Sequence, residues 1–450
     1  MILMAAVCLA MSTGESIAAE TAASTHMPNL VFIMADDLGW ADVGFHGGNA
    51  PTPNLDRLAA ENLELLAHYV APVCSPTRTG LMTGRQWSRY GVVNPQNNRA
   101  LPFDTVTLPR ALKEQGYATC LTGKWHLGSL PDWGPNHFGF DHGYGSLAGG
   151  VTPWLHRYKK GPYTETWHRD EVLIEEQGHV TDLITHEALT WLEGHATERF
   201  FLYVPYTAVH LPIKEPSEWV ERVPASITGD VPRHYAASVM HLDDCVGQLV
   251  SALDRLKVRE QTLLVFTSDN GGSTAENNDL QYPDDMCPNG RLPGNNLPWR
   301  GQKGDLYEGG VRVPAIVSWP GHVPAGKTDE PVQIIDWMPT LCSLAGYSAT
   351  ESLNWDGVDI SGLLLRHESL PERPLYSVGL GGKLRSLRRG DWKLIVRGEG
   401  ELRRVELFNL RNDPGEQSNL FEKEVPRLMA MLRELEEFSS HDREDEVPKE

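Results

Sequence analysis

The stretch Val73-Cys74-Ser75-Pro76-Thr77-Arg78-Thr79-Gly80-Leu81-Met82-Thr83-Gly84-Arg85 places a cysteine two residues before a proline and four before an arginine. Proline suits the first turn of a helix, so the pattern predicts a helix that starts just after Cys74. A side chain at such a position lies where the helix dipole favours developing negative charge. Taken alone, a single cysteine near an arginine is as often a buried small hydrophobic residue as a nucleophile. The rest of the chain therefore has to decide between these two interpretations.

Two apolar runs elsewhere in the chain end in oxygen-bearing side chains. Residues 28–34 (PNLVFIM) are nearly all apolar, which is typical of a strand buried on both faces, and residues 262–267 (TLLVFT) are similar. The polar residues that follow them are Asp36, Asp37, Asp269 and Asn270. Ligands usually bind at the carboxyl ends of the strands in open α/β sheets, so we expect these four side chains to lie at a functional edge.

Helix and strand patterns alternate over most of the chain. We expect helices over 52–67, 108–115, 179–193, 235–256 and 334–344, and strands over 28–34, 117–122, 200–204, 262–267 and up to Trp319. This alternation predicts an α/β fold in which a large mixed, mainly parallel sheet is sandwiched by helices. Residues 129–178 and 271–298 have little periodicity and are expected to be irregular loops near the site.

The pattern changes after about residue 365. Short runs separated by turn residues between 375 and 408 predict a small antiparallel sheet, and residues 425–438 form an amphipathic pattern that predicts a helix. We therefore expect a catalytic domain over residues 27–365. The C-terminal subdomain, residues 366–450, is expected to combine the small sheet with the packing helix.

The N-terminal residues and the net charge limit the expected location of the protein and the classes of partner that it binds. Residues 2–11 form an apolar run too short to cross a bilayer, which predicts a cleaved export signal over 1–24 and a periplasmic or secreted protein. No later run is apolar and long enough for a membrane span. A formal net charge of −20 argues against nucleic acid as a partner. Any positive charge that an anionic substrate needs must therefore be concentrated in the site.

The cysteine count leaves the disulfide pattern open. Six cysteines occur, and setting aside Cys8 in the leader and Cys74 leaves four, which allows two disulfides or none. They show no paired metal-ligand spacing.

The oxygen-bearing residues at the two strand ends suit a hard cation. Three carboxylates and one amide are typical ligands of Ca²⁺ or Mg²⁺ rather than of zinc. Asp and Asn are also common in turns, so either pair alone is a weak signal. Lys124 and His126 follow another predicted strand two residues apart, and in extended chain this spacing projects both side chains to one face.

Several motifs in order resemble one enzyme family. CSPTR with LMTGR at 74–85, GKWHLG at 123–128 and SDNGG at 268–272 resemble the signatures of the type I, formylglycine-dependent sulfatases, which are arylsulfatase-like members of the alkaline phosphatase superfamily. The resemblance continues through EGGVRVP at 308–314 and ELFNLRNDPGEQSNL at 406–420. It implies an alkaline phosphatase-like fold and hydrolysis of sulfate esters.

The resemblance also implies a modified nucleophile and a metal ion. In this family a maturation enzyme oxidises the motif cysteine to formylglycine, whose hydrate attacks the sulfur of a sulfate ester. Cys74 is then the catalytic position, supported by Arg78. The implied cation is Ca²⁺, with Mg²⁺ as the alternative, and its implied ligands are Asp36, Asp37, Asp269, Asn270 and residue 74.

The resemblance also implies the remaining roles, which suit the charge that develops in the reaction. Lys124 and Lys303 hold the sulfate, because its nonbridging oxygens need positive partners. His210 protonates the leaving oxygen. His126 helps to remove a proton from the second hydroxyl of the covalent sulfate ester, so that sulfate is eliminated and the aldehyde returns.

We expect a sulfated carbohydrate rather than a simple aryl sulfate as substrate, because the resemblance favours it and the irregular loops offer side chains that suit sugar hydroxyls and carboxylates. The candidates for sugar contact are Trp133, Trp154, His156, Arg157, Trp167 and His168, although surface loops have the same composition. Two alternatives stay open. One is a phosphodiester or phosphonate monoester hydrolase of the same superfamily. The other is a non-catalytic sulfated-glycan binding protein, which requires an unmodified Cys74.

Overall fold

A ten-stranded sheet forms the centre of the molecule in the computed structural model, which describes residues 27–348 and 353–443. Its strand order is β11-β2-β10-β9-β1-β8-β4-β5-β6-β7, and the five strands from β9 to β5 run parallel. These five are β1 (Asn29–Ala35), β4 (Ala118–Lys124), β5 (His142–Ser146), β8 (Phe200–Pro205) and β9 (Thr262–Ser268). The outer strands are β2 (Leu63–Leu65), β6 (Trp167–Arg169), β7 (Val172–Leu173), β10 (Ala315–Ser318) and β11 (Gly326–Thr328).

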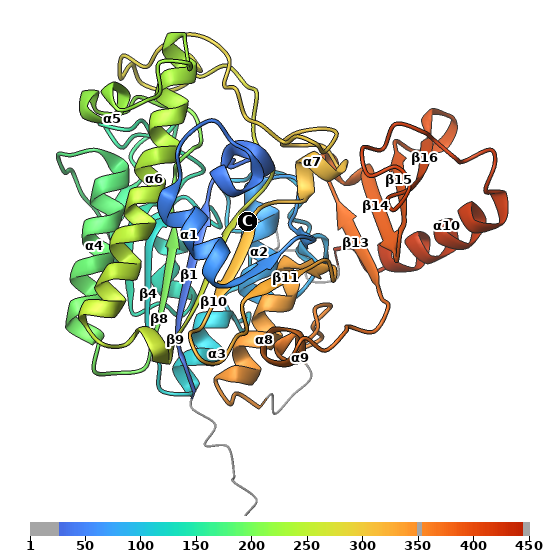
Figure 1. Cartoon of the computed structure of the whole chain (residues 1–450), viewed down its shortest axis with the longest axis horizontal. Coiled ribbons are helices and arrows are strands. Elements are labelled where there is room, and N and C mark those ends of the chain that lie inside the picture. The colour runs from blue at the N-terminus through green and yellow to red at the C-terminus, as the bar shows by residue number, and fades with distance from the viewer. Residues whose placement is uncertain (1–26, 349–352, 444–450) are drawn as a thin grey trace, which may run out of the picture.

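Helices cover both faces of this sheet (Figure 1). The longer ones are α1 (Pro53–Glu61), α2 (Cys74–Thr83), α3 (Leu108–Glu114), α4 (Val180–His195), α6 (Asp230–Arg255) and α8 (Trp337–Leu344). Strand β1 shows why both faces are covered, since all its residues are buried. Val31 and Ile33 pack into the core under α1, α4 and α6, whereas Phe32 and Met34 pack into the core under α2, α3 and α8. A strand with two apolar faces can be stable only between two helical layers.

A separate four-stranded antiparallel sheet follows the main domain and lies to one side of it (Figure 1). It consists of β13 (Pro374–Val378), β14 (Leu384–Arg389), β15 (Trp392–Arg397) and β16 (Arg404–Asn409), and α10 (Val425–Ser439) packs against it. The predicted fold class is thereby confirmed. The domain boundary near residue 365 stays a prediction. The predicted export signal lies outside the described residues.

Two features of the fold differ from the sequence prediction. The helix expected over 52–67 ends at Glu61, and its last part is strand β2. The region 129–178 was expected to be irregular, yet it contains β5, β6 and β7. Strand β5 is hard to recognise because it is HGYGS: a Cβ on Gly145 would lie 2.3 Å from the Gly123 carbonyl oxygen, so this close strand approach requires glycine.

The structure also bears on the predicted disulfides and on membrane-spanning helices. All five cysteines of the described residues are free, so the option of two disulfides does not hold there. In the same part of the chain, every helix is too short or too polar to cross a membrane.

Candidate active site

The carboxyl ends of three central strands meet the N-terminus of α2. Asp36 and Asp37 follow β1 directly, Asp269 and Asn270 follow β9, and Lys124 is the last residue of β4. Because β1 and β9 run parallel with Ala35 opposite Ser268, the residues after both strands leave the sheet side by side. The edge that the sequence predicts is therefore formed by these strand ends.

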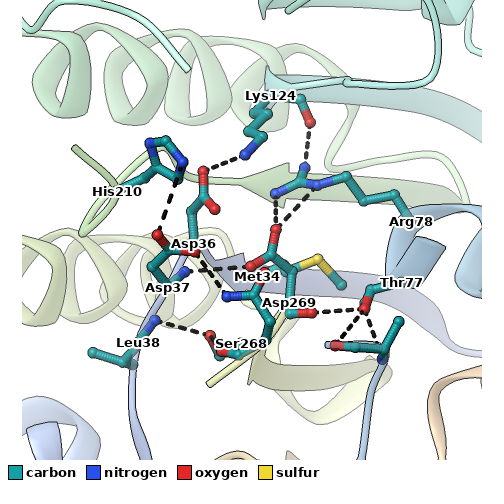
Figure 2. A network of polar contacts seen from close by, with 12 residues as sticks. Met34, Asp36, Asp37, Leu38, Thr77, Arg78, Lys124, His210, Ser268 and Asp269 are labelled. Carbon is teal, nitrogen blue, oxygen red and sulfur yellow. Dashed lines mark hydrogen bonds and ion pairs between the residues drawn. The ribbon is translucent and has the colours of Figure 1, made fainter. Parts of the chain in front are cut away.

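Each carboxylate at this edge is paired with one buried or partly buried cation, and Figure 2 shows the pairs of Asp36 and Asp269. Lys124 Nζ lies 2.6 Å from Asp36 Oδ2, and Lys303 Nζ lies 2.7 Å from Asp37 Oδ1. Arg78 Nη2 lies 2.8 Å from Asp269 Oδ2, and Arg78 Nη1 donates to the Lys124 carbonyl oxygen at 2.5 Å. Lys303 comes from a loop far along the chain, so its side chain joins the cluster only through the tertiary fold. The site thus brings three cationic side chains together in an acidic protein, each balanced by one carboxylate.

Cys74 is the first residue of α2 and is buried. One ligand atom from each of Asp36, Cys74 and Asp269 lies within 4.8 Å of the others. Thr77 anchors this end of the helix, because its hydroxyl donates to the Asp269 carbonyl oxygen at 2.6 Å and accepts from Ala71 N at 2.9 Å. Position 74 is thereby fixed between the carboxylates and the helix N-terminus.

Burial and charge give the acidic pair opposite pKa shifts. Burial and the nearby Asp269 raise the pKa of Asp36 to about 8, although Lys124 opposes this. Burial would also raise the pKa of Asp37, but Lys303 and His210 outweigh it and lower the pKa to about 2. A cation held between these groups would relieve the repulsion between Asp36 and Asp269.

Two oxygen atoms test whether a hard cation fits this site. Asp36 Oδ1 and Asn270 Oδ1 are buried and, within the described part of the chain, have no hydrogen-bond partner. Buried polar atoms without a partner are uncommon in folded proteins. Together with the carboxylates of Asp37 and Asp269 at the same strand ends, they offer an all-oxygen donor set, which fits Ca²⁺ or Mg²⁺.

The Cys74 thiol itself is a poor nucleophile in this environment. Burial raises its pKa, although Lys124 and Lys303 favour the thiolate. Cysteine enzymes usually depend on a lowered thiol pKa, which this site does not provide. The surroundings of Cys74 therefore suit a modified residue better than a thiolate nucleophile.

The two predicted histidines border the same cluster. His210 Nε2 lies 3.8 Å from Asp37 Oδ2, and the His210 Nδ1 atom contacts the Leu211 carbonyl oxygen. Burial and Lys303 lower the pKa of His210, and burial and Lys124 lower the pKa of His126. Both shifts favour the neutral form of the rings before a substrate binds.

One residue near the candidate site was not among the sequence predictions. A Cβ on Gly150 would lie 2.9 Å from the Tyr282 hydroxyl and 3.1 Å from His210 Nδ1, so Tyr282 and His210 both border Gly150. Tyr158 packs edge-on against the Tyr282 ring at 5.8 Å, and Lys159 lies over the same ring while pairing with Asp279 at 2.7 Å. Tyr282 lies in the unpatterned loop 271–298, so no local signal marked it.

The predicted sugar-contacting residues differ in burial and in position. His156, Trp167 and His168 are buried, and the His156 ring stacks on Trp167 at 4.8 Å, which argues for packing rather than sugar contact. Trp154 and Arg157 line a cavity of about 540 Å³ together with His156 and Trp167. Trp133 is half-buried, and its carbonyl oxygen accepts from the Trp125 indole.

Comparison with known proteins shows which families and relatives the chain resembles. The Sulfatase family model matches residues 28–347, and the model "N-sulphoglucosamine sulphohydrolase, C-terminal" matches residues 301–441. The chain is 36% identical to Arylsulfatase J of Mus musculus, covering 75% of the chain and 56% of that protein. It is 33% identical to N-acetylgalactosamine-6-sulfatase of Mus musculus, covering 81% and 71%. The chain thus spans little more than half of the first of these relatives.

Solved structures agree with this placement. The crystal structure of Ps i-CgsB in complex with k-i-k-neocarrahexaose is similar with a TM-score of 0.82 and 31% identity, covering 94% of this chain and 95% of that one. The phosphonate monoester hydrolase SpPMH from Silicibacter pomeroyi shares the fold, with a TM-score of 0.65 at 16% identity, covering 92% and 96%.

Fold and site together define an alkaline phosphatase-like enzyme with an acidic, cation-paired strand edge. Within that class the chain belongs to the sulfatase family, the sulfuric ester hydrolases. Members of this family generally use a metal ion and a formylglycine residue.

Proposed function

We propose that this protein hydrolyses sulfate esters of carbohydrates with a formylglycine made from Cys74. The observation that carries the proposal is the position of Cys74, buried at the start of α2 between Asp36 and Asp269. The carbohydrate class is supported by relatives whose names include N-acetylgalactosamine-6-sulfatase and by the likeness to Ps i-CgsB bound to an oligosaccharide. The proposal includes export of the protein and a maturation enzyme that oxidises Cys74.

The chemistry divides between the implied groups and the chain's own residues. A formylglycine at position 74 would supply a hydrate nucleophile, and a Ca²⁺ or Mg²⁺ held by Asp36, Asp37, Asp269 and Asn270 would favour its ionised form. Lys124 and Lys303 provide positive charge for the nonbridging oxygens of the sulfate. Arg78 neutralises Asp269 and fixes the Lys124 backbone, so it positions both.

The histidines carry the proton transfers in this proposal. The contact of His210 Nδ1 with the Leu211 carbonyl leaves Nε2 directed toward Asp37 and the site, where it exchanges a proton with the leaving oxygen. Lys124 and His126 leave the end of β4 together, which places the second histidine beside the sulfate-holding cation. His126 Nδ1 is buried and has no hydrogen-bond partner among the described residues, so the ring is available to accept a proton.

Peptide mass spectrometry of the segment around Cys74 tests the proposal first. Protein from a host able to make formylglycine should show the mass loss of thiol-to-aldehyde conversion, and it should hydrolyse an aryl sulfate. Comparing matched aryl sulfate and aryl phosphonate esters separates the sulfatase from the phosphonate hydrolase, which the shared fold alone does not. An unmodified thiol in two such hosts, with glycan binding but no turnover, favours the non-catalytic binding protein.

Removal of the cation should abolish activity. Because a bound metal contributes several kcal/mol of transition-state stabilisation, chelation is expected to lower kcat/KM for an aryl sulfate by roughly 100-fold or more. Re-addition of Ca²⁺ or Mg²⁺ should restore turnover, and the ion that does so at the lower concentration identifies the preferred metal. Full activity after exhaustive chelation, with no metal detected by elemental analysis, would contradict the all-oxygen site.

The loss of activity in the His210→Ala variant should depend on the leaving group of the substrate. We expect loss of roughly 10²- to 10⁴-fold for a sugar sulfate, whose alcohol needs a proton, and a much smaller loss for 4-nitrophenyl sulfate, whose leaving group needs none. The ratio of the two kcat/KM values is the measurement, and each substrate serves as the control for the other. Equal losses on both substrates would show that His210 acts in binding instead.

A further inference from the structure

Two histidines and two carboxylates meet at a second place, formed by α4, α6 and the loop after β8. His241 of α6 has a carboxylate at each ring nitrogen: Glu215 Oε2 lies 2.8 Å from Nδ1, and Asp182 Oδ1 lies 3.0 Å from Nε2. His179 directly precedes α4, and its Nε2 lies 3.7 Å from the same Glu215 oxygen. One ligand atom from each of His179, Asp182 and His241 lies within 4.8 Å of the others.

One nitrogen of each ring faces Glu215, and the other faces away from it. Glu215 is buried, and its Oε2 accepts from His241 Nδ1 at 2.8 Å but lies 3.7 Å from His179 Nε2, beyond hydrogen-bond distance. The other two nitrogens are His241 Nε2, which lies 3.0 Å from Asp182 Oδ1, and His179 Nδ1. The latter accepts only from Thr181 N at 3.4 Å, which is near the limit of a hydrogen bond. One nitrogen of each ring belongs to the group that contains the Asp182 carboxylate.

The cluster is incompletely satisfied as it stands. The His179 side chain is 3% exposed, yet its Nε2 has no hydrogen-bond partner anywhere in residues 27–348 and 353–443. A buried ring nitrogen without a partner costs free energy, and such groups usually have a functional explanation. If His179 Nδ1 bound a ligand, a small movement of the ring could bring Nε2 within hydrogen-bond distance of Glu215 Oε2, which now lies 3.7 Å away.

The distances fit one tetrahedral ion. Two imidazoles on a zinc ion, each with a Zn–N distance of about 2 Å, have ring centres roughly 5 Å apart. The His179 and His241 ring centres are 5.2 Å apart. Asp182 supplies a third ligand, and its 59% exposed side chain gives ions a path from solvent. Two imidazoles and a carboxylate suit a first-row transition metal rather than Ca²⁺.

We propose that His179, Asp182 and His241 bind a Zn²⁺-type divalent ion, with Glu215 orienting both imidazoles through their distal nitrogens. A carboxylate that accepts from the second nitrogen of a metal-bound histidine is the usual outer support of such sites. The ion joins α4, α6 and the loop that carries His210, five residues before Glu215. Its role is to fix that loop, and it is separate from the oxygen-lined site at Asp36.

Titration with Co²⁺ tests this site without reference to catalysis. Purified full-length protein is stripped of metal, saturated with Ca²⁺ to occupy the oxygen-lined site, and titrated with CoCl₂ and separately with ZnCl₂. We expect one equivalent of Co²⁺ to give the visible absorption of a four-coordinate ion. It should also quench tryptophan fluorescence, because Trp219 stacks on His241 at 4.7 Å and Trp154 contacts His179 at 5.2 Å. ZnCl₂ should displace the Co²⁺.

Three variants identify the ligands. Asp182→Asn changes a largely exposed side chain and leaves the fold intact. Asp182→Asn and His179→Gln, made as separate variants, should each weaken Co²⁺ binding at least 10-fold. Glu215→Gln should weaken it by roughly 10- to 100-fold through the lost support of the rings. His186→Gln, an exposed position on α4, is the matched control and should bind as the wild type does.

The same titration can overturn the proposal. If Ca²⁺-saturated wild type takes up no Co²⁺ or Zn²⁺, His241 is simply an imidazolium held between two carboxylates. If Asp182→Asn and His179→Gln bind as tightly as His186→Gln does, the ion binds elsewhere. Either result rejects the site.

Discussion

Replacement of Cys74 by alanine is expected to lower kcat/KM for an aryl sulfate by roughly 10⁴- to 10⁶-fold, the range seen when an enzyme loses its nucleophile. Serine at the same position should behave differently, because a serine sulfate ester has no second hydroxyl from which sulfate can be eliminated. Cys74→Ser is therefore expected to release at most one equivalent of alcohol and then stop.

Rapid-mixing measurement of alcohol release, with mass spectrometry of the stalled protein, distinguishes these outcomes. Cys342→Ala is the matched control, because it also removes a fully buried thiol, in α8, away from the cluster. It should keep kcat/KM within a few-fold of the wild type, whatever its effect on stability. Sustained turnover by Cys74→Ala at the rate of Cys342→Ala would exclude formylglycine chemistry at position 74.

The acidic half of the candidate site could be predicted from the sequence because strand ends are local signals. Residues 29–35 are buried on both faces, as their apolar run predicts, and the carboxylates directly after them lie at the sheet edge. Parallel pairing of β1 with β9 then brings Asp269 next to Asp37, whose backbone N donates to Asp269 Oδ1 at 3.3 Å. The apolar pattern of the strands and the position of the polar residues directly after them are enough for this part of the prediction.

The remainder depends on contacts that have no local signal. Leu63–Leu65 continues the leucine pattern of a helix, yet it pairs with β10 and β11 and becomes a strand. Trp167 reads as an exposed loop aromatic, but antiparallel pairing of β6 with β5 buries it. The cluster around His241 combines residues from three separated segments, so it became visible only in three dimensions. Tertiary pairing overrides local pattern at each of these places.

The C-terminal sheet is joined to the site through a buried ion cluster. Lys393 of β15 is 2% exposed, and its Nζ lies 2.7 Å from Glu308 Oε1 and 2.9 Å from Glu416 Oε1. Glu308 starts the short helix α7 (Glu308–Val311), five residues after Lys303, and its backbone N donates to Glu416 Oε2 at 2.7 Å. Arg300 also donates to the Glu416 carbonyl oxygen at 2.6 Å. The loop that supplies Lys303 is thus held at both ends by the C-terminal part of the chain.

Lys393→Met is expected to lower the free energy of unfolding by about 3–5 kcal/mol, because it leaves two buried carboxylates without their shared cation. Urea unfolding followed by circular dichroism measures the loss. Lys383→Met removes an exposed lysine 3.8 Å from Glu399 and should change the free energy by no more than about 0.5 kcal/mol. Because the loop of Lys303 loosens, kcat/KM should also fall in Lys393→Met while it stays constant in Lys383→Met. Equal unfolding free energies for the two variants would show that Glu308 and Glu416 do not need Lys393.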